Sequence, residues 1–223
     1  MSCTQCSGIR EQFNDPAIAK VLRRYRRRGP DKTTRILIGA IREITEADDV
    51  RDATLLDVGA GIGAIHHDLL DGRLQRAIHL DASPAQVAYA REETERRGHG
   101  DRVQFVDGDF TALAEQLLPA DLVTLDRVIC CFDDMPRLVH ASAGKARRYW
   151  GAVYPRDVSW MRVAIAVINV VQRVKRSTFR VFLHDPRAID AALRDEGLRQ
   201  RVLRRTAGWQ VVVYERSPTP TVT

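Results

Sequence analysis

Long apolar runs and cysteines are both scarce in this chain of 223 residues. No stretch reaches the roughly 18 consecutive apolar residues that a membrane-spanning helix needs. The opening residues, MSCTQCSGIR, contain no apolar run of signal-peptide length, so we expect a cytoplasmic protein. In that compartment the four cysteines are expected to be reduced. No strong excess of one charge is present either, because 35 basic and 29 acidic residues are scattered along the chain, which is typical of a solvated surface.

The apolar content of 44% is enough for one substantial core. From Thr54 onward, short β-type runs alternate with helical runs. The β-type runs are TLLDVG, AIHLD, VQFVDGD, DLVTLD and AVYP, and the helical runs are AIHHDLLDG, PAQVAYAREETERRG, TALAEQLL and MPRLVHASAGKARRYW. This alternation predicts a parallel sheet with right-handed crossovers and helices on both faces, with the ligand at the carboxyl ends of the strands.

The end of the chain follows a different pattern. Residues 186–197 (PRAIDAALRDEG) predict an amphipathic helix, and QRVLRR and WQVVVYER predict an antiparallel hairpin. The predicted fold is therefore α/β and Rossmann-like, with a seven-stranded, mostly parallel sheet and a terminal hairpin. Residues 1–50 are predicted to form an N-terminal helical cap on a domain of residues 51–223. Within that domain, residues 157–185 are predicted to form a helical insertion after the fifth strand.

The stretch LLDVGAGIGAI, from Leu55 to Ile65, predicts a glycine-rich turn between the first strand and its helix. Such a turn lets the backbone approach a ligand closely, and it suits dinucleotides and other adenosine-containing cofactors equally well. Asp57 discriminates between them, because a pyrophosphate gains nothing from a nearby carboxylate. Asp57 therefore favours a ligand with a cationic end.

Two further acids follow the next two predicted strands. Asp81 ends AIHLD, where a carboxylate can accept hydrogen bonds from two vicinal ribose hydroxyls. Asp109, after the third strand, can accept one from an adenine amine, and the backbone amide of Phe110 can contact the ring. Three carboxylates at successive strand ends fit one adenosine-containing ligand.

The motifs DVGAGIG, HLD, GDF and DLVTLDRV, in this order and spacing, resemble the class I S-adenosylmethionine-dependent methyltransferases over residues from about 30 to 216. Within that class, LDRVICC and LHDPRAIDAALRDEGL are most similar to small-molecule enzymes such as the magnesium-protoporphyrin O-methyltransferases. The resemblance implies S-adenosylmethionine as cofactor. The residues that it implies for binding the cofactor are Asp57, Gly59, Ala60, Gly61, Gly63, Asp81, Ala82, Asp109, Phe110 and Asp126.

Candidate catalytic residues follow from the chemistry that this family performs. Methyl transfer from a sulfonium releases a neutral group, so the protein has to align the reactants, exclude water and, for a hydroxyl acceptor, remove a proton. Asp126 and Arg127 end the fourth strand, where Asp126 can orient cofactor or acceptor. Arg127 either clamps an acidic acceptor group or holds the loop in an ion pair. His184 is the candidate general base.

The insertion SWMRVAIAVINVVQRVKR predicts a helix with a broad apolar face and a polar stripe of Arg162, Asn169, Arg173 and Arg176. Three interpretations remain open: a packed cap helix, a lid over an apolar acceptor, and a helix lying in a membrane surface through residues 157–176. The packed cap helix is the default interpretation, and the membrane-surface helix comes second because basic residues accompany Trp160.

Two other clusters invite functional interpretations. The arginines of RRYRRR, from Arg23 to Arg28, could bind nucleic acid. We expect no such partner, because there is no binding module, no aromatic platform and no Asn-Pro-Pro signature of base-amine methyltransferases. Cys3 and Cys6 could meet Cys130 and Cys131 to bind zinc or a softer element. The simpler interpretation, with no metal, is the one we adopt.

The sequence therefore predicts S-adenosylmethionine-dependent methyl transfer, preferably to oxygen, on a small apolar or acidic molecule. Two alternatives stay open: a non-catalytic module that senses the cofactor or binds a partner through the same pocket, and a nucleic-acid methyltransferase.

Overall fold

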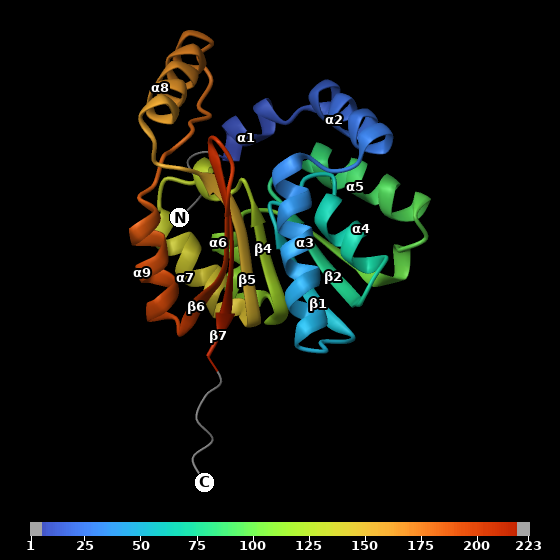
Figure 1. The fold of residues 1–223 in the computed structure, drawn as a ribbon. Helices are drawn as coiled ribbons and strands as arrows, with labels where there is room; N and C mark the ends of the chain where they lie inside the picture. Colours follow the sequence, from blue (N-terminus) through green and yellow to red (C-terminus); the bar gives the residue numbers. More distant parts are fainter. Residues whose placement is uncertain (1–5, 218–223) are drawn as a thin grey trace.

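The computed structural model describes residues 6–217 and contains a seven-stranded sheet between two layers of helices (Figure 1). The strands are β1 (Ala53–Val58), β2 (Leu74–Asp81), β3 (Val103–Asp107), β4 (Ala120–Asp126), β5 (Ala146–Pro155), β6 (Leu198–Arg205) and β7 (Trp209–Arg216). Their order is β3-β2-β1-β4-β5-β7-β6, and β7 runs antiparallel to both of its neighbours. The predicted fold is confirmed, including the terminal hairpin.

Nine α-helices surround this sheet in the described part of the chain. They are α1 (Cys6–Gln12), α2 (Asp15–Arg28), α3 (Lys32–Ala47), α4 (Ala64–Leu70), α5 (Pro84–Arg96), α6 (Phe110–Leu113), α7 (Met135–Lys145), α8 (Ser159–Val174) and α9 (Pro186–Asp195). Short 3₁₀ turns lie at Gly100–Arg102, Ala114–Gln116 and Ile129–Cys131. No helix in residues 6–217 is long and apolar enough to cross a bilayer.

Two hydrophobic cores lie on opposite faces of the sheet. Successive residues of a strand point to opposite faces, so Leu55 packs in the core under α3 and α4 while Leu56 packs in the core under α7 and α9. A parallel sheet covered on both faces needs such continuous apolar runs. The carboxyl ends of β1 and β4, which are adjacent, mark the point where the strand order reverses. That point is where sheets of this type bind ligands.

One secondary-structure prediction was wrong. The run MPRLVHASAGKARRYW was expected to form a single helix, but α7 ends at Lys145 and ARRYW begins the long strand β5. Trp150 and Tyr149 are buried in the cores on opposite faces of the sheet, and Trp150 donates a hydrogen bond from Nε1 to Ser142 Oγ over 2.9 Å. Burial of these aromatic side chains between helices and a paired strand outweighs the local helical pattern.

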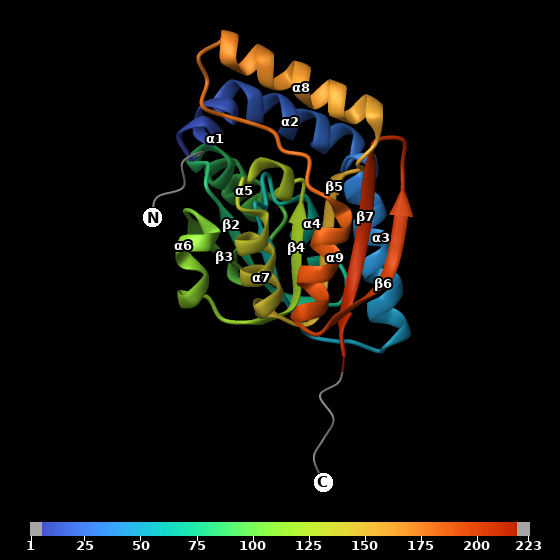
Figure 2. The same cartoon turned by 90° about the vertical axis from the view of Figure 1, so that its left-hand side faces the viewer.

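The segment of residues 1–50 divides into two parts in the structure. Helix α3 packs on the sheet through Leu37, Ile41 and Ile44, and so belongs to the body of the domain. Helices α1 and α2 instead extend across the carboxyl ends of the strands, and α8 projects from the same end (Figures 1 and 2). The cap over the sheet is therefore α1 and α2, with α8 beside them.

Candidate active site

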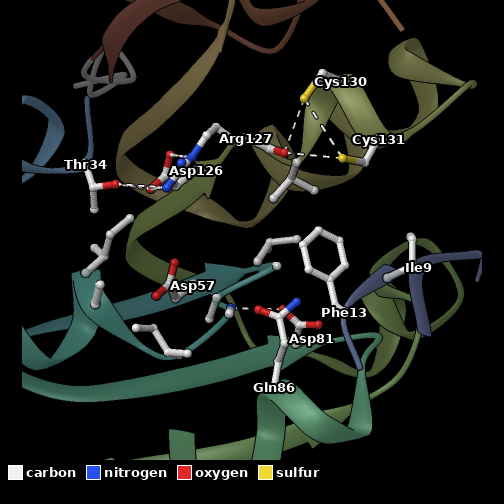
Figure 3. A pocket seen from close by; sticks show the side chains of 18 of the residues that line it. Ile9, Phe13, Thr34, Asp57, Asp81, Gln86, Asp126, Arg127, Cys130 and Cys131 are labelled. Carbon is white, nitrogen blue, oxygen red and sulfur yellow. Dashed lines mark hydrogen bonds and ion pairs between the residues drawn. The ribbon is translucent and has the colours of Figure 1, made fainter. Parts of the chain in front are cut away.

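A cavity of about 500 Å³ opens at the carboxyl ends of β1, β2 and β4. Its volume falls in the range of small-molecule sites. One side, which we call the floor, is formed by the strand ends and the glycine turn, including Asp57, Gly61 and Asp81 (Figure 3). The opposite side, which we call the roof, is formed by apolar side chains of α1, α2, α8 and the turn between α1 and α2. The roof residues are Ile9, Phe13, Ile18, Val21, Met161, Ile165 and Ile168.

The glycine turn after β1 takes a backbone shape that other residues rarely adopt. Gly59 and Gly61 have φ values of 61° and 60°. A Cβ at Gly59 would come within 2.4 Å of a Val128 methyl, and one at Gly61 within 2.8 Å of Gln86 Oε1. These two glycines and Ala60 line the cavity, so the backbone is open to a ligand there.

Gly63 lies in a different environment from the other two glycines. It has φ 83° and precedes α4, but it is not part of the cavity wall. A Cβ there would meet the rings of His66 and His67 at 2.5 and 2.8 Å. A glycine is therefore required at position 63 because a side chain would clash with buried histidines, and not because a ligand approaches there.

Asp57 is a buried carboxylate that faces the cavity. Its Oδ1 accepts a 2.7 Å hydrogen bond from Thr124, and its Oδ2 lies 3.2 Å from His66 Nδ1. Burial raises the pKa of Asp57 to about 7 and lowers the pKa of His66 to about 3, so His66 is a neutral donor. No lysine or arginine of residues 6–217 is ion-paired with Asp57. The site therefore holds a buried acid with no lysine or arginine counter-charge, which suits a cationic ligand group.

Asp81 fixes the glycine turn to the end of β2. Its two oxygens accept hydrogen bonds from the backbone amides of Gly61, over 2.9 Å, and Ser83, over 2.8 Å. Burial raises the pKa of Asp81 to about 6 despite these two bonds. Each oxygen retains a further lone pair for ligand hydroxyls. Ala82, the next residue, also lines the cavity.

Asp109 and Phe110 lie at the start of α6, on the cavity wall. Asp109 Oδ1 accepts a 2.9 Å hydrogen bond from the Thr111 amide and caps the helix. Phe110 is buried in the core under α7. The cap orients Asp109 and leaves its second oxygen with no hydrogen bond to the described residues.

Asp126 and Arg127 form a polar network with the start of α3. Thr34 donates a 2.6 Å hydrogen bond to Asp126 Oδ2, and Arg127 is ion-paired with Asp126 over 3.2 Å and with Asp31 over 3.0 Å. Burial alone would lower the pKa of Arg127, but the two carboxylates hold it above its usual value. Arg127 itself has φ 62°, which turns the chain sharply after β4. All four residues of this network line the cavity.

His184 lies apart from the other candidate residues. It is not in the cavity wall, its Nε2 donates a 2.9 Å hydrogen bond to the Phe132 carbonyl, and its ring stacks on Phe182 at 5.9 Å. The structure therefore brings together Asp126 and Arg127 with the floor acids, but not His184.

The two histidines after the glycine turn support it from inside the protein. His66 and His67 are completely buried, and His66 supports Asp57 from beneath the turn. Sequence reasoning missed Thr34 and Thr124, which hold Asp126 and Asp57. Thr34 is 92 residues from its partner, so no local pattern pointed to it.

The proposed cysteine cluster can be followed only in part. Cys130 and Cys131 line the cavity with their sulfurs 4.0 Å apart, and both thiols donate to the Arg127 carbonyl. Cys3 and the side chain of Cys6 lie outside the described residues. Within the described part of the chain, no three histidine, cysteine or acidic side chains come together as metal ligands.

Comparisons with known proteins converge on one family. Residues 49–202 match the family model described as a methyltransferase domain. The chain is 36% identical over 94 residues to 3-amino-4-hydroxybenzoate 4-O-methyltransferase of Streptomyces cremeus, and 38% identical over 86 residues to erythromycin 3''-O-methyltransferase of Saccharopolyspora erythraea. These matches cover 41% and 38% of this chain. The chain spans only about a quarter of the length of either relative, 25% in each case.

A solved structure is similar over nearly the whole chain. Magnesium protoporphyrin IX methyltransferase from Synechocystis PCC 6803, with bound SAH, aligns with a TM-score of 0.70 and 18% identity. The alignment covers 94% of this chain and 98% of that one. At this identity the likeness establishes a shared fold.

Proposed function

The chain belongs to the methyltransferase-domain family, the class I S-adenosylmethionine-dependent methyltransferases, and on this premise we propose that it transfers a methyl group to an oxygen atom of a small, largely apolar molecule. The observation that carries the proposal is the division of one cavity into a floor of buried acids and an apolar roof. A polar, partly cationic cofactor fits the floor, and an apolar acceptor fits the roof.

The floor residues suit the cofactor by their chemistry. We assign Asp57 to its ammonium group, Asp81 to its ribose hydroxyls and Asp109 to its adenine, with the open backbone of Gly59 and Gly61 between them. When bound, S-adenosylmethionine supplies an electrophilic methyl group on a sulfonium. Among the described residues no lysine or arginine pairs with Asp57, and its one histidine partner, His66, is neutral, which supports the assignment of Asp57 to the cationic end.

The other residues of the cavity align the acceptor, exclude water and provide a group that can interact with the proton of the acceptor hydroxyl. The roof excludes water, and a fixed cavity holds the acceptor in line. We propose that Asp126 accepts a hydrogen bond from the acceptor hydroxyl, and that Arg127 positions Asp126 through their ion pair. For an acidic acceptor, Arg127 would supply the counter-charge and no base would be needed. His184 is retained only as a second candidate base, since it lies outside the cavity wall.

The choice of oxygen and of a small molecule is supported by the two curated relatives, which are both named as O-methyltransferases. The matched part is a fraction of each relative, so their acceptors are not transferred to this chain. A test can start from a metabolite extract of the source organism and methyl-labelled S-adenosylmethionine. We expect label to enter an apolar product that contains a methyl ether or ester.

Two variants make this test specific. Asp81→Ala should weaken cofactor binding by about 1 to 3 kcal/mol, because it removes charged hydrogen bonds to the ribose. Asp107→Ala, at the end of β3 but outside the cavity wall, is the matched control and should bind and react normally. If the protein binds the cofactor but transfers label to no component of the extract, the proposed catalytic function is contradicted. A non-catalytic module that senses the cofactor would then be favoured.

A further inference from the structure

Helix α8 carries most of the exposed large apolar side chains of the described chain. Among residues 6–217 only two others, Val21 and Leu118, are comparably exposed. Those on α8 are Trp160, Val163, Val167, Ile168, Val170, Val171 and Val174. Val163 is 64% exposed and Val174 is 79% exposed, which is unusual for valines in a regular helix. Such a concentration on one element indicates a surface that another body covers.

Five of these side chains form one stripe along the helix. Trp160, Val163, Val167, Val170 and Val174 are spaced by three and four residues in turn, which places them on the same face. We call this face the valine stripe. It is separate from the inner side of α8, which is already occupied. There Met161 and Ile165 are buried, and Asn169 exchanges hydrogen bonds of 2.8 and 2.9 Å with the backbone of Val181.

The charges around the valine stripe are mostly positive, although Asp157, just before the helix, is ion-paired with Arg162 over 2.6 Å. Residues 158–184 contain no aspartate or glutamate and five basic residues, which are Arg162, Arg173, Lys175, Arg176 and Arg180. Arg173 and Lys175 are exposed and lie on either side of the stripe in helical projection. The arginines Arg23, Arg27 and Arg28 of α2 are exposed at the same end of the molecule (Figure 1). An apolar stripe with tryptophan and flanking basic residues is the pattern of helices that lie in anionic lipid surfaces.

We propose that α8 is a docking surface for an anionic phospholipid bilayer, with the valine stripe inserted among the acyl chains and the basic residues at the headgroups. Charge complementarity selects this occupant, because a second copy of the chain would bring the same positive charges to the contact. Figure 2 shows α8 running across the end of the molecule as its outermost element, so the helix can lie flat on a surface.

This surface has a direct connection to the cavity. The inner side of the same helix supplies Met161, Ile165 and Ile168 to the cavity wall. Docking therefore sets the apolar roof against the bilayer, where an apolar acceptor would partition. Only this consequence rests on the proposed function, since lipid binding itself requires neither cofactor nor turnover.

Vesicle co-sedimentation tests the proposal directly. We expect the full chain to bind vesicles of phosphatidylcholine mixed with phosphatidylglycerol at least about tenfold more tightly than vesicles of phosphatidylcholine alone. Val163→Gln combined with Val167→Gln should weaken binding to the anionic vesicles by about tenfold or more. Arg173→Glu combined with Lys175→Glu should remove the preference for anionic lipid.

Matched controls lie at the other end of the sheet. Leu118→Gln changes an equally exposed apolar residue, and Arg147→Glu changes an exposed basic residue at the start of β5, so both should bind vesicles like the wild type. Calorimetry with S-adenosylmethionine on every variant separates loss of lipid binding from loss of the cofactor site or the fold.

Three results would overturn the proposal. If the wild-type protein binds neither vesicle type, or binds both equally well, an anionic bilayer is not the partner. If the double valine variant binds anionic vesicles as well as the wild type does, the valine stripe is not the binding surface. A stable dimer in sedimentation velocity that dissolves in that same variant identifies a second copy as the occupant of α8.

Discussion

The floor and the roof of the cavity are built by different means. The floor consists of strand ends and a glycine turn whose acids are held by short, buried hydrogen bonds, as with Asp81 on the amides of Gly61 and Ser83. The roof consists of helices added outside the sheet. Of these, α2 is packed through Ile18, Leu22 and Tyr25, whereas α8 buries only Met161 and Ile165.

This difference separates two kinds of specificity. A ligand bound by the floor is selected by backbone shape and carboxylates that the sheet fixes in place. A ligand bound by the roof is selected by apolar shape, on helices that can vary without disturbing the sheet. We therefore expect changes to the floor to act on cofactor affinity and changes to the roof to act elsewhere.

The largest expected effect comes from blocking the floor with Gly61→Val. The substitution introduces a side chain where φ is 60° and where a Cβ already meets Gln86, so cofactor affinity should fall by more than about 100-fold. Gly98→Val is the control for backbone strain. Gly98 has φ 71° with nothing within 4 Å of its Cβ position, so it should lose stability but keep cofactor affinity. Calorimetry that finds Gly61→Val binding normally would show that the turn does not face the cofactor.

Asp57→Asn should separate stability from binding. Burial raises the pKa of Asp57 to about 7, so the native state holds its proton more tightly than the unfolded chain, and native stability falls as pH rises from about 4 to 7. At pH 8 the neutral amide should stabilise the free protein by on the order of 1–3 kcal/mol. Cofactor affinity should fall by about 2–3 kcal/mol, because the counter-charge to the ammonium is lost. Denaturation with and without cofactor measures both, and a loss of stability in the free variant would contradict this account.

The anchor of α2 gives a roof prediction of intermediate size. Glu93 is fully buried and accepts hydrogen bonds from Arg26 over 2.8 Å and Arg97 over 3.0 Å. Burial alone would raise the pKa of Glu93, but its arginines lower it to about 2. The resulting stability is present above pH 4.5 and is lost as pH falls from there towards 2.

Glu93→Gln should therefore destabilise the protein by about 2 kcal/mol at pH 7, with cofactor affinity of the folded protein unchanged. The adjacent Glu92→Gln is the control, because Glu92 is exposed and pairs only with Arg26 among the described residues, so its effect should stay below about 0.5 kcal/mol. Equal midpoints for the two variants in denaturant titrations would mean that this buried cluster does not anchor the roof.

The smallest expected effect is a pH dependence of cofactor binding. An ammonium group beside Asp57 lowers the pKa of that acid in the complex, so affinity should rise by about tenfold in all as pH increases from 6 to about 8. In Asp57→Asn the profile should be flatter. Titrations in buffers of different ionisation enthalpy report the released proton directly, and a flat wild-type profile would separate Asp57 from the cationic end.

The floor is far easier to predict from the sequence than the rest of the site. Glycine spacing and an acid after each strand are local patterns whose geometry follows from the parallel sheet, so the sequence alone is enough to single out Asp57, Asp81 and Asp109. Gly63 shares the spacing but not the environment, because the helix that follows turns it towards His66 and His67. The glycine spacing alone therefore cannot distinguish a glycine that faces the ligand from one that packs against buried side chains.

The remaining features depend on contacts that are distant in sequence. Thr34 reaches Asp126 only because α3 packs against the sheet, and ARRYW is a strand because it pairs with β4 and β7. The exposure of the valine stripe on α8 also follows from no local pattern, since an apolar helix face is normally buried. Such features can be recognised only in the folded structure.

The central claim is that the floor binds S-adenosylmethionine, and parallel calorimetric titrations with S-adenosylmethionine, S-adenosylhomocysteine and NAD test it most directly. The two sulfur compounds share the amino acid and adenosine ends that the floor acids would hold, whereas NAD brings a pyrophosphate to the turn beside Asp57. We expect saturable binding of S-adenosylmethionine and S-adenosylhomocysteine and none of NAD. Tight binding of NAD with no response to the other two would contradict the account.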